Sequence, residues 1–265
     1  MNKDWIEILL AAIYSSSEKI MEVYKTNFDV ELKEDRSPVT LADTLSSQII
    51  NDHLIKTGIP VISEEDIKPS FEKRKNHSKI WLVDPLDGTK EFILKNDEFC
   101  INIALIHNGA PVFGMIASPT NKQIIFGGKS IGVFHIPYGT KNYLDKQFKV
   151  KSIKTQKKDK GLIYSRSHFT PGVSKLIIQL EEKYGSLEII KKGSALKFFD
   201  LVLGNAHFYP RMAPTMEWDI AAGDAIYRAV GGEVLDFTNF ESLKYNKASL
   251  FNPNFIAKPV GLSLN

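Results

Sequence analysis

The chain lacks several features that would place a protein quickly in a large functional class. It has 265 residues but only one cysteine, Cys100, so an internal disulfide is excluded and the sequence fits a reducing compartment. It has no Walker loop, no His-Glu-x-x-His and no Cys-x-x-Cys, so common P-loop, zinc-protease and thiol-redox signatures are missing. It also has no apolar run near the ~20 residues of a membrane-spanning helix.

Positive and negative charges nearly balance, which argues against a protein that binds nucleic acid through its net charge. The net charge is +3, and 43% hydrophobic with 25% charged residues is typical of a soluble globular protein. Lysines concentrate in residues 141–160, where we expect a solvated connection between two halves of the chain. Residues 1–5 do not show the basic and then apolar pattern of a signal peptide, so we expect a cytoplasmic protein.

The segment Ile80–Glu91 carries the strongest local pattern. Its first four residues form an apolar run that predicts a buried strand, and Pro85 should end that strand because proline lacks the backbone N–H. Two carboxylates, a flexible glycine and a hydroxyl surround the proline: Asp84, Asp87, Gly88 and Thr89. Hard divalent cations such as Mg²⁺ prefer oxygen ligands of this kind. An Asp-Pro turn with a solvated second acid is the alternative when the segment is read alone.

Three further acids stand at the ends of predicted elements. Glu64 begins an acidic run directly after a short strand, Pro60–Ser63, as Asp84 does after its own strand. Because ligands gather at strand ends, these two acids suggest a shared site. Asp219 stands in the first turn of a predicted helix, and Asp43 in the first turn of another. Each has a structural alternative: a solvated loop for Glu64, a helix-start acid for Asp219 and a capping box for Asp43.

The pattern of predicted elements changes near residue 150. Residues 1–150 read as two helices and a large antiparallel sheet with most of the candidate metal ligands, and residues 151–265 as an α/β half that completes the site. The predicted strands of the first half are 60–63, 80–83, 99–106, 112–117, 123–126 and 131–136, with an Asn108-Gly109 hairpin. In the second half we expect strands 162–165, 187–190, 207–209 and 233–237 between helices 174–184, 195–203 and 218–230. The fold class is α/β, with an α+β first half.

Taken together, three acidic motifs resemble the metal-dependent, lithium-sensitive phosphatases of the inositol monophosphatase superfamily. They are Ser63-Glu64-Glu65, Asp84-Pro85-Leu86-Asp87-Gly88-Thr89 and Trp218-Asp219-Ile220-Ala221-Ala222-Gly223. Within the superfamily the chain is most similar to the CysQ-type 3'(2'),5'-bisphosphate nucleotidases. That similarity rests on Trp81–Phe92, Tyr164–His168, Gly193–Phe198 and Tyr209–Arg211. Inositol phosphatases usually carry Asn where this chain has Glu91, which argues against them.

The resemblance implies a five-layer αβαβα sandwich of the inositol monophosphatase and fructose-1,6-bisphosphatase type, with two or three Mg²⁺ ions per site. The implied metal ligands are Glu64, Asp84, the Leu86 backbone carbonyl, Asp87 and Asp219, with Asp84 bridging two ions. The implied catalytic residues are Asp43, Thr89 and Glu64, with Asp43 and Thr89 orienting or deprotonating a water. We assign Thr89 a relay role toward Asp43, because a hydroxyl is not itself a strong base.

The implied reaction is hydrolysis of 3'-phosphoadenosine 5'-phosphate to AMP and phosphate. The implied substrate-binding residues are Glu64, Leu86, Asp87, Gly88, Thr89, His168, Ser194, Lys197 and Asp219. Lys197 would lie one turn into a helix that Gly193-Ser194 precedes, where backbone N–H groups attract phosphate. The alternatives are a solvated helix lysine for Lys197 and an ordinary loop histidine for His168.

Two other functions stay open from the sequence. One is a phosphatase of the same fold that acts on inositol phosphates or sugar phosphates. The other is a non-catalytic module that binds metal or phosphate, using its lysine-rich segment to grip RNA. The complete set of acids argues against a degenerate enzyme, and the lysines lack interleaved stacking residues that favour RNA. We therefore expect a small-molecule substrate, no nucleic acid and no integral membrane segment, with a peripheral place at the inner face of the cell membrane left open.

Overall fold

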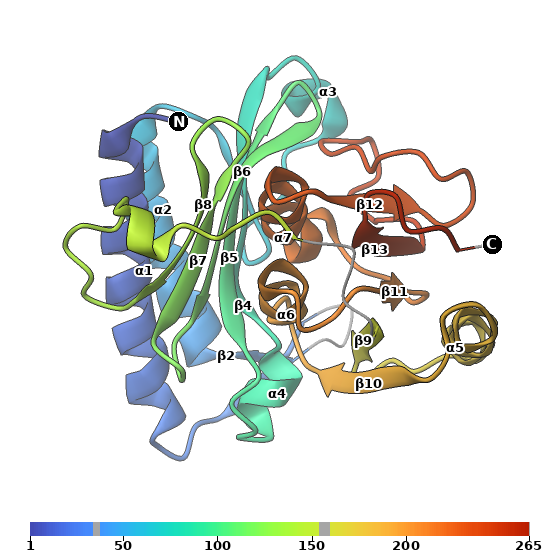
Figure 1. Cartoon of the computed structure of the whole chain (residues 1–265). Helices are drawn as coiled ribbons and strands as arrows, with labels where there is room; N and C mark the ends of the chain where they lie inside the picture. Colours follow the sequence, from blue (N-terminus) through green and yellow to red (C-terminus); the bar gives the residue numbers. More distant parts are fainter. Residues whose placement is uncertain (34–37, 154–159, 265) are drawn as a thin grey trace.

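A computed structural model of the chain describes residues 1–33, 38–153 and 160–264. Its elements stack in five layers, which Figure 1 shows from one side: a pair of helices, a large sheet, a second pair of helices, a smaller sheet and a single helix. This is the αβαβα sandwich that the resemblance implied. Among the described residues, no helix is both long and apolar enough to span a membrane.

The first two layers come from the first half of the chain. Helices α1 (Lys3–Tyr24) and α2 (Leu41–Leu54) pack on a sheet with the strand order β3-β4-β5-β6-β7-β8. The strands are β3 (Val61–Ser63), β4 (Lys79–Asp87), β5 (Cys100–His107), β6 (Ala110–Ser118), β7 (Gln123–Gly128) and β8 (Gly132–Pro137). Only the β3–β4 pair is parallel. The predicted hairpin between β5 and β6 is confirmed, with positive φ at both Asn108 and Gly109.

Short elements fill the connections of the first half. They are β1 (Val30–Leu32), β2 (Pro38–Thr40), η1 (Ile55–Thr57), α3 (Phe71–Arg74), α4 (Thr89–Ile93) and η2 (Lys146–Phe148). Strands β1 and β2 pair with each other. The lysine-rich connection is not wholly solvated, because Val150 and Ile153 pack against the central core. Part of that connection, 154–159, lies outside the described residues.

The other three layers come from the second half. Helices α6 (Lys197–Leu203) and α7 (Glu217–Ala229) form the middle layer, and α5 (Pro171–Tyr184) forms the outer one. Between them lie β9 (Lys160–Ser165), β10 (Leu187–Lys192), β11 (Tyr209–Arg211), β12 (Gly232–Asp236) and β13 (Phe255–Pro259). Strands β9 and β10 are parallel, β11-β13-β12 are antiparallel, and a bridge between Leu162 and Phe208 joins the two groups.

Two strand predictions were wrong in placement, and three strands, β1, β2 and β13, were missed. Strand β4 does not stop at Pro85 but runs to Asp87, because a register shift after Asp84 places the proline where no ladder N–H is needed. Strand β11 was expected at 207–209 and begins at Tyr209. Strand β13 was not predicted, although it pairs with both β11 and β12. The division into parts 1–150 and 151–265 stays a prediction.

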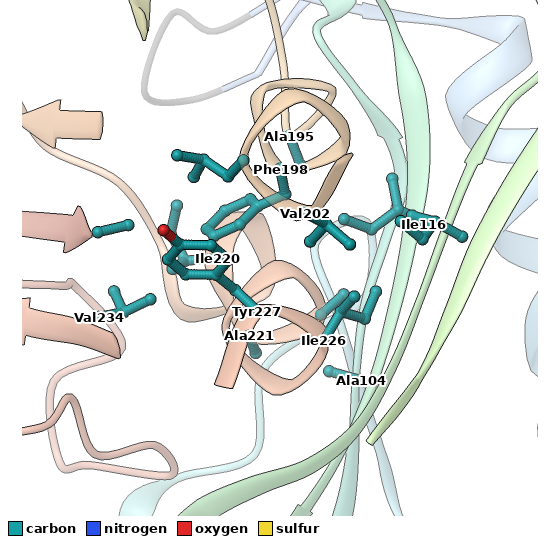
Figure 2. Close-up of a cluster of buried hydrophobic side chains, with 14 of the residues drawn as sticks. Ala104, Ile116, Ala195, Phe198, Val202, Ile220, Ala221, Ile226, Tyr227 and Val234 are labelled. Atoms are coloured by element: carbon teal, nitrogen blue, oxygen red, sulfur yellow. The ribbon is translucent and has the colours of Figure 1, made fainter. Parts of the chain in front are cut away.

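Both faces of the large sheet are covered by helices, which explains its continuous apolar runs. Along β4, Trp81 and Val83 join the core beneath α1 and α2, whereas Ile80 and Leu82 join the core beneath α6 and α7. A strand buried on both faces needs apolar residues at every position instead of an alternation. Figure 2 shows the central core, where side chains from the sheet, both inner helices and β12 meet; the labelled ones are Ala104, Ile116, Ala195, Phe198, Val202, Ile220, Ala221, Ile226, Tyr227 and Val234.

Small residues let α7 lie unusually close to its neighbours. A methyl group added at Gly114 of β6 would lie 2.0 Å from the carbonyl oxygen of Ala222, and one added at Gly223 would lie 2.1 Å from the Phe198 ring. Real side chains do not approach so closely, so backbone contact fixes the depth of α7 between the layers. Because Asp219 stands in the first turn of α7, this packing also sets the position of a candidate ligand.

We expect Gly114→Ala to destabilise the fold, because its neighbour is backbone that cannot move without shifting α7. Overpacking of this kind should lower the free energy of unfolding by about 3 kcal/mol. For a chain of this length, that corresponds to a melting temperature roughly 10 °C lower. Thermal and urea unfolding followed by circular dichroism would measure both.

Gly172→Ala is the matched control. A methyl group at Gly172 would also meet an atom, at 2.5 Å, but that atom is the sulfur of the flexible Met212 side chain. Its unfolding free energy should change by less than about 1 kcal/mol, since methionine can adopt another rotamer. Equal losses in the two variants would contradict the account of α7 packing.

Candidate active site

A cavity of about 550 Å³ opens where β3, β4 and β9 end and where α6 and α7 begin. Ten of the eleven residues that the sequence suggested for the site line this cavity: Glu64, Asp84, Leu86, Asp87, Gly88, Thr89, His168, Ser194, Lys197 and Asp219. The eleventh, Asp43, lies behind Thr89 and contacts its hydroxyl. Residues far apart in the sequence therefore meet at one place, as the shared-site hypothesis required.

The turn after Asp84 is held by hydrogen bonds from both directions. The Leu86 N–H donates to Asp84 Oδ1 at 3.1 Å, and the Ser46 hydroxyl of α2 donates to the Pro85 carbonyl at 2.8 Å. Side-chain oxygens that accept a backbone N–H two residues ahead stabilise such turns. The turn therefore presents its carboxylates and the Leu86 carbonyl to the cavity in a fixed arrangement.

Three acids form the most compact group of the site. Glu64, Asp84 and Asp219 each place one carboxylate oxygen within 4.8 Å of the other two. Burial, with the neighbouring charges of Glu64, Asp87 and Asp219, raises the pKa of Asp84 well above its ordinary value. Burial and the charges of Asp87 and Glu64 raise the pKa of Asp219 in the same way. An all-oxygen donor set that repels itself fits Mg²⁺, which removes the repulsion when it binds.

Protein contacts hold two of these acids: Asp219 keeps the helix-start role that was its alternative, whereas Glu64 is not the solvated loop acid of its alternative. The carboxylate of Asp219 accepts the N–H of Met216 at 2.9 Å, as an acid in the first turn of a helix often does. Glu64 accepts the indole N–H of Trp218 at 3.1 Å and pairs with the Lys33 ammonium at 2.9 Å. These contacts aim the carboxylates, so the structural and the metal-binding interpretations are compatible.

Asp87 lies beside this group and is oriented differently. Its Oδ2 accepts hydrogen bonds from Asn102 Nδ2 at 3.1 Å and from the Ala195 N–H at 2.5 Å. Burial raises its pKa, whereas the nearby Lys197 ammonium lowers it, and burial prevails. Since these donors all contact Oδ2, the other oxygen is the one able to bind a cation. The predicted metal role of Asp87 thus stays a prediction, with one oxygen already committed to the protein.

Thr89 and Asp43 form the pair that the sequence suggested for handling a proton. The Thr89 hydroxyl donates to Asp43 Oδ1 at 3.1 Å and lies 3.3 Å from the Leu86 carbonyl. The other oxygen of Asp43 accepts both the N–H and the hydroxyl of Thr40, at 2.8 and 2.7 Å. The predicted capping box of Asp43 is therefore confirmed, and the same carboxylate reaches the site. Burial raises its pKa, and hydrogen bonds from Thr40 and Thr89 oppose that shift.

Lys197 is not the solvated lysine that one alternative proposed. Its side chain is buried, with 3% of the residue exposed, and burial lowers its pKa to about 8. The ammonium contacts the Ser194 carbonyl, donates to the Lys192 carbonyl at 3.3 Å and lies 5.2 Å from the Tyr209 ring centre. A buried cation facing a polar cavity is suited to bind an anion.

The phosphate-attracting helix start at Gly193-Ser194 was a wrong prediction. Helix α6 begins only at Lys197. The Gly193 N–H donates to Glu98 at 2.7 Å and the Ala195 N–H donates to Asp87, so protein carboxylates already occupy both groups. His168 lies in the turn after β9, with Nδ1 3.2 Å from the Ser165 hydroxyl. Burial and the charge of Arg211 lower the pKa of His168.

The structure adds several cations to the cavity that sequence reasoning missed. Lys33, Lys68, Lys90 and Arg211 line it, together with the exposed ring of Phe251. Lys33 and Lys68 lie beside acidic runs in the sequence, but charged runs usually indicate solvated surface. The side chains of Lys33 and Lys68 point into the cavity because the β1–β2 pair and the loop after β3 fold over the site. A local sequence pattern does not reveal that folding. The signal for Arg211 was its place in a motif of the resembling family.

Comparison with known proteins agrees with this geometry. The sequence model of the inositol monophosphatase family matches residues 1–259. The 3'(2'),5'-bisphosphate nucleotidase CysQ of Escherichia coli strain K12 is 37% identical over 246 residues, which cover 91% of this chain and 94% of that protein. The protein of the same name from Haemophilus influenzae is 32% identical over 259 residues, covering 97% and 93%.

A solved structure agrees with the sequence relatives. The crystal structure of CysQ from Bacteroides thetaiotaomicron, described as a bacterial member of the inositol monophosphatase family, matches with a TM-score of 0.84. It is 38% identical in sequence, and the match covers 96% of this chain and 97% of that one. The chain therefore belongs to the inositol monophosphatase family.

Proposed function

We propose that the protein is a Mg²⁺-dependent 3'(2'),5'-bisphosphate nucleotidase that hydrolyses 3'-phosphoadenosine 5'-phosphate to AMP and phosphate. One observation carries the proposal: a single cavity joins a cluster of three carboxylates to a buried ammonium, that of Lys197. The carboxylates suit the cations that a reacting phosphate needs, and the ammonium suits a second phosphate. Relatives named as bisphosphate nucleotidases match nearly the whole chain, which supports the same activity.

The acidic residues would hold the metal. Glu64, Asp84, the Leu86 carbonyl, Asp87 and Asp219 offer oxygen donors at one end of the cavity, enough for two or three Mg²⁺ ions. Bound Mg²⁺ would supply positive charge to the reacting phosphate and to the departing oxygen. The hydrogen bonds from Met216, Trp218 and Asn102 keep the carboxylates aimed at that end.

Thr89 and Asp43 would manage the proton of the attacking water. While the Thr89 hydroxyl donates to Asp43, its oxygen, which borders the cavity, can still accept a hydrogen bond from a water. A proton can then pass from water to Thr89 as Thr89 passes its own to Asp43. The water oxygen forms a bond to phosphorus, and the bond from phosphorus to the 3' oxygen breaks. That oxygen leaves as the 3' hydroxyl of AMP after taking a proton from a solvent water, and Asp43 returns its proton to solvent.

The opposite wall would bind the rest of the nucleotide. Lys197 and Arg211 offer positive charge to the phosphate that does not react, and His168 and Ser194 border the same space. Glu91, whose presence argued against an inositol phosphatase, is buried there and accepts the Ser167 hydroxyl at 2.8 Å. It thereby ties the turn that bears His168 to the metal-binding half.

A panel of substrates tests the proposed function. Phosphate release would be measured in Mg²⁺ with 3'-phosphoadenosine 5'-phosphate, inositol 1-phosphate and fructose 1,6-bisphosphate. We expect the highest kcat/KM with the bisphosphate nucleotide. A higher value with inositol 1-phosphate would favour the second phosphatase hypothesis, and no release from any of the three would favour a binding module.

We expect Asp87→Asn to reduce kcat by more than about a hundredfold, because the amide keeps the shape of the carboxylate but loses its charge. The fold should persist, since an amide oxygen can still accept from Asn102 and Ala195. The measurement is steady-state phosphate release together with a melting curve. Asp52→Asn, an exposed position on α2, serves as the control. Turnover within about tenfold of wild type would mean that Asp87 is not a metal ligand.

We expect Li⁺ to inhibit at concentrations where Na⁺ and K⁺ do not. A small hard cation can enter an oxygen site built for Mg²⁺, but it brings only half the charge. Phosphate release would be followed with each chloride salt at tens of millimolar, roughly the range in which the three ions should separate on this argument. Equal responses to all three salts would count against the Mg²⁺ assignment.

We expect Lys197→Ala to weaken recognition of the second phosphate. The value of kcat/KM for 3'-phosphoadenosine 5'-phosphate should fall. The loss should correspond to roughly 1.5–3 kcal/mol of transition-state stabilisation, the scale of a hydrogen bond to a charged group. Hydrolysis of 3'-AMP, which lacks that phosphate, should hardly change. Steady-state kinetics with both substrates provides the comparison.

Lys191→Ala, an exposed lysine on the neighbouring strand, is the control for Lys197. It should leave both substrates unaffected. Equal losses on the two substrates in Lys197→Ala would place this lysine in the catalytic machinery or in the fold. No loss on either would show that it does not bind substrate.

A further inference from the structure

Two turns from the second half of the chain form part of the cavity wall, and one of them also reaches the metal-binding half directly, since the Ala195 N–H donates to Asp87. The turn 165–168 follows β9 and carries His168, and the turn 193–195 follows β10 and leads into Lys197. The metal-binding residues come mainly from the first half. The distance between the two walls therefore depends on contacts that cross from one half to the other.

Glu98 makes several of these contacts with a single carboxylate. It lies between α4 and β5 in the first half, and its carboxylate accepts three hydrogen bonds from the second half. Arg166 Nε donates to Oε2 at 2.8 Å and Arg166 NH2 donates to Oε1 at 2.7 Å, which is the two-pronged geometry that favours arginine. The Gly193 N–H donates to Oε2 at 2.7 Å. One carboxylate thus contacts both turns of the wall.

Arg166 fastens the two turns to each other as well. Its N–H donates to the Lys192 carbonyl at 3.2 Å, and its NH2 donates to the Lys191 carbonyl at 3.2 Å. Glu98 therefore holds both turns at once, whereas the Ala195–Asp87 and Ser167–Glu91 hydrogen bonds each hold one of them. Hydrogen bonds to Glu98 from Arg166 and Gly193 outweigh the effect of burial and lower its pKa, so the carboxylate is ionised at neutral pH.

The packing around these turns leaves little room for adjustment. A methyl group at Gly193 would lie 2.6 Å from the Glu91 side chain and 2.9 Å from the Glu98 carbonyl oxygen. Ser194 has a φ of 47°, a left-handed conformation that an L-residue keeps only when its surroundings hold it. A change in the anchor should therefore shift the neighbouring Ser194 and Lys197 instead of being absorbed locally.

Neither Glu98 nor Arg166 is among the residues that line the cavity. Their side chains are 18% and 45% exposed, and a pair this exposed contributes little to the free energy of unfolding. Its geometric effect is larger, because misplacing a binding group by about 1 Å can cost a large factor in rate or affinity. The pair is placed to act on the position of the wall more than on global stability.

We propose that the Glu98–Arg166 pair is a positioning device that sets the spacing between the acidic cluster and the wall bearing His168, Ser194 and Lys197. The enzyme then favours phosphate esters that are long enough to reach both walls over plain monoesters. This proposal rests on the proposed nucleotidase function. Glu98 and Arg166 act through other residues and have no role in the chemical step.

Kinetics of Glu98→Gln tests the proposal in the full-length protein with Mg²⁺. We expect KM for 3'-phosphoadenosine 5'-phosphate to rise about tenfold while kcat stays within roughly threefold, because binding is lost and chemistry is not. KM for 3'-AMP should change by less than about threefold, since it lacks the distal phosphate. Arg166→Lys, which keeps the charge but not the two-pronged geometry, should give an intermediate rise.

The effects on KM of changing Glu98 and Arg166 should not be additive. The double variant Glu98→Gln/Arg166→Gln should raise KM no more than about twofold beyond Glu98→Gln alone, because either change already breaks the pair. Glu233→Gln is the matched control, since Glu233 also forms a partly buried ion pair, with Lys258, but lies on β12 away from the cavity. It should leave KM unchanged for both substrates. Additive effects of the two single changes would overturn the proposal.

Hydrogen exchange gives a readout that does not depend on activity. In Glu98→Gln, amides of the segments 165–168 and 192–196 should exchange faster than in wild type, whereas those of β5 and β6 should not. If wild type fails to hydrolyse the bisphosphate nucleotide, the proposed function is wrong and the exchange result still decides whether Glu98 holds the wall. If wild type hydrolyses it but the Glu98 and Arg166 variants keep its KM and exchange pattern, the positioning role is wrong.

Discussion

Repulsion among closely spaced, partly buried carboxylates is the constraint on which the rest of this structure depends. Glu64, Asp84 and Asp219 meet within 4.8 Å at the end of the large sheet, and Asp87 adds a further charge beside them. Like charges in a buried place disfavour the folded state unless something opposes them. The turn after Asp84, the first turn of α7 and the Trp218 indole hold the acids together against that repulsion. A bound divalent cation would replace the repulsion among these carboxylates with attraction to the cation, and so stabilise the fold as well as the site.

The middle helical layer allows such a cluster to form. Helix α7 lies so close to β6 that a single added methyl would collide with its backbone, and this closeness brings Asp219 to the end of β4. The small residues of α7 look like ordinary helix composition in the sequence. In the folded protein they determine how close α7 lies to the large sheet, and therefore where the candidate ligand Asp219 lies. Core packing and site geometry are therefore coupled in this protein, since a larger residue between α7 and β6 would also displace the Asp219 carboxylate.

The sequence predicted the parts of the molecule that depend on local chemistry. The apolar run beginning at Ile80, the Asn108-Gly109 turn and the capping box of Asp43 follow from the residues themselves, and all three are present. It also indicated ten lining residues of the cavity, mainly through motifs shared with a family. It failed where partners are distant. Pro85 was read as a strand end because the bulge that accommodates it depends on β5.

The same limit applies to the site. The N–H groups at Gly193 and Ala195 looked available for phosphate because their acceptors, Glu98 and Asp87, lie about a hundred positions earlier in the chain. Strand β13 was missed because its neighbours β11 and β12 both precede it, with a long loop between. No periodicity in one segment reveals a partner in another. Burial likewise decides the state of Lys197, and burial is a property of the assembled layers.

The single cysteine gives this site an intrinsic reporter. Cys100 is fully buried on β5, and its sulfur lies 3.7 Å from the carboxylate of Asp87. Burial and that neighbouring charge raise the pKa of the thiol, so it is protonated and unreactive in the closed structure. Because the chain has one cysteine, its rate of modification by a thiol reagent measures how often this part of the sheet opens. A ligand that binds beside Asp87 should slow that rate, which allows occupancy to be followed without turnover.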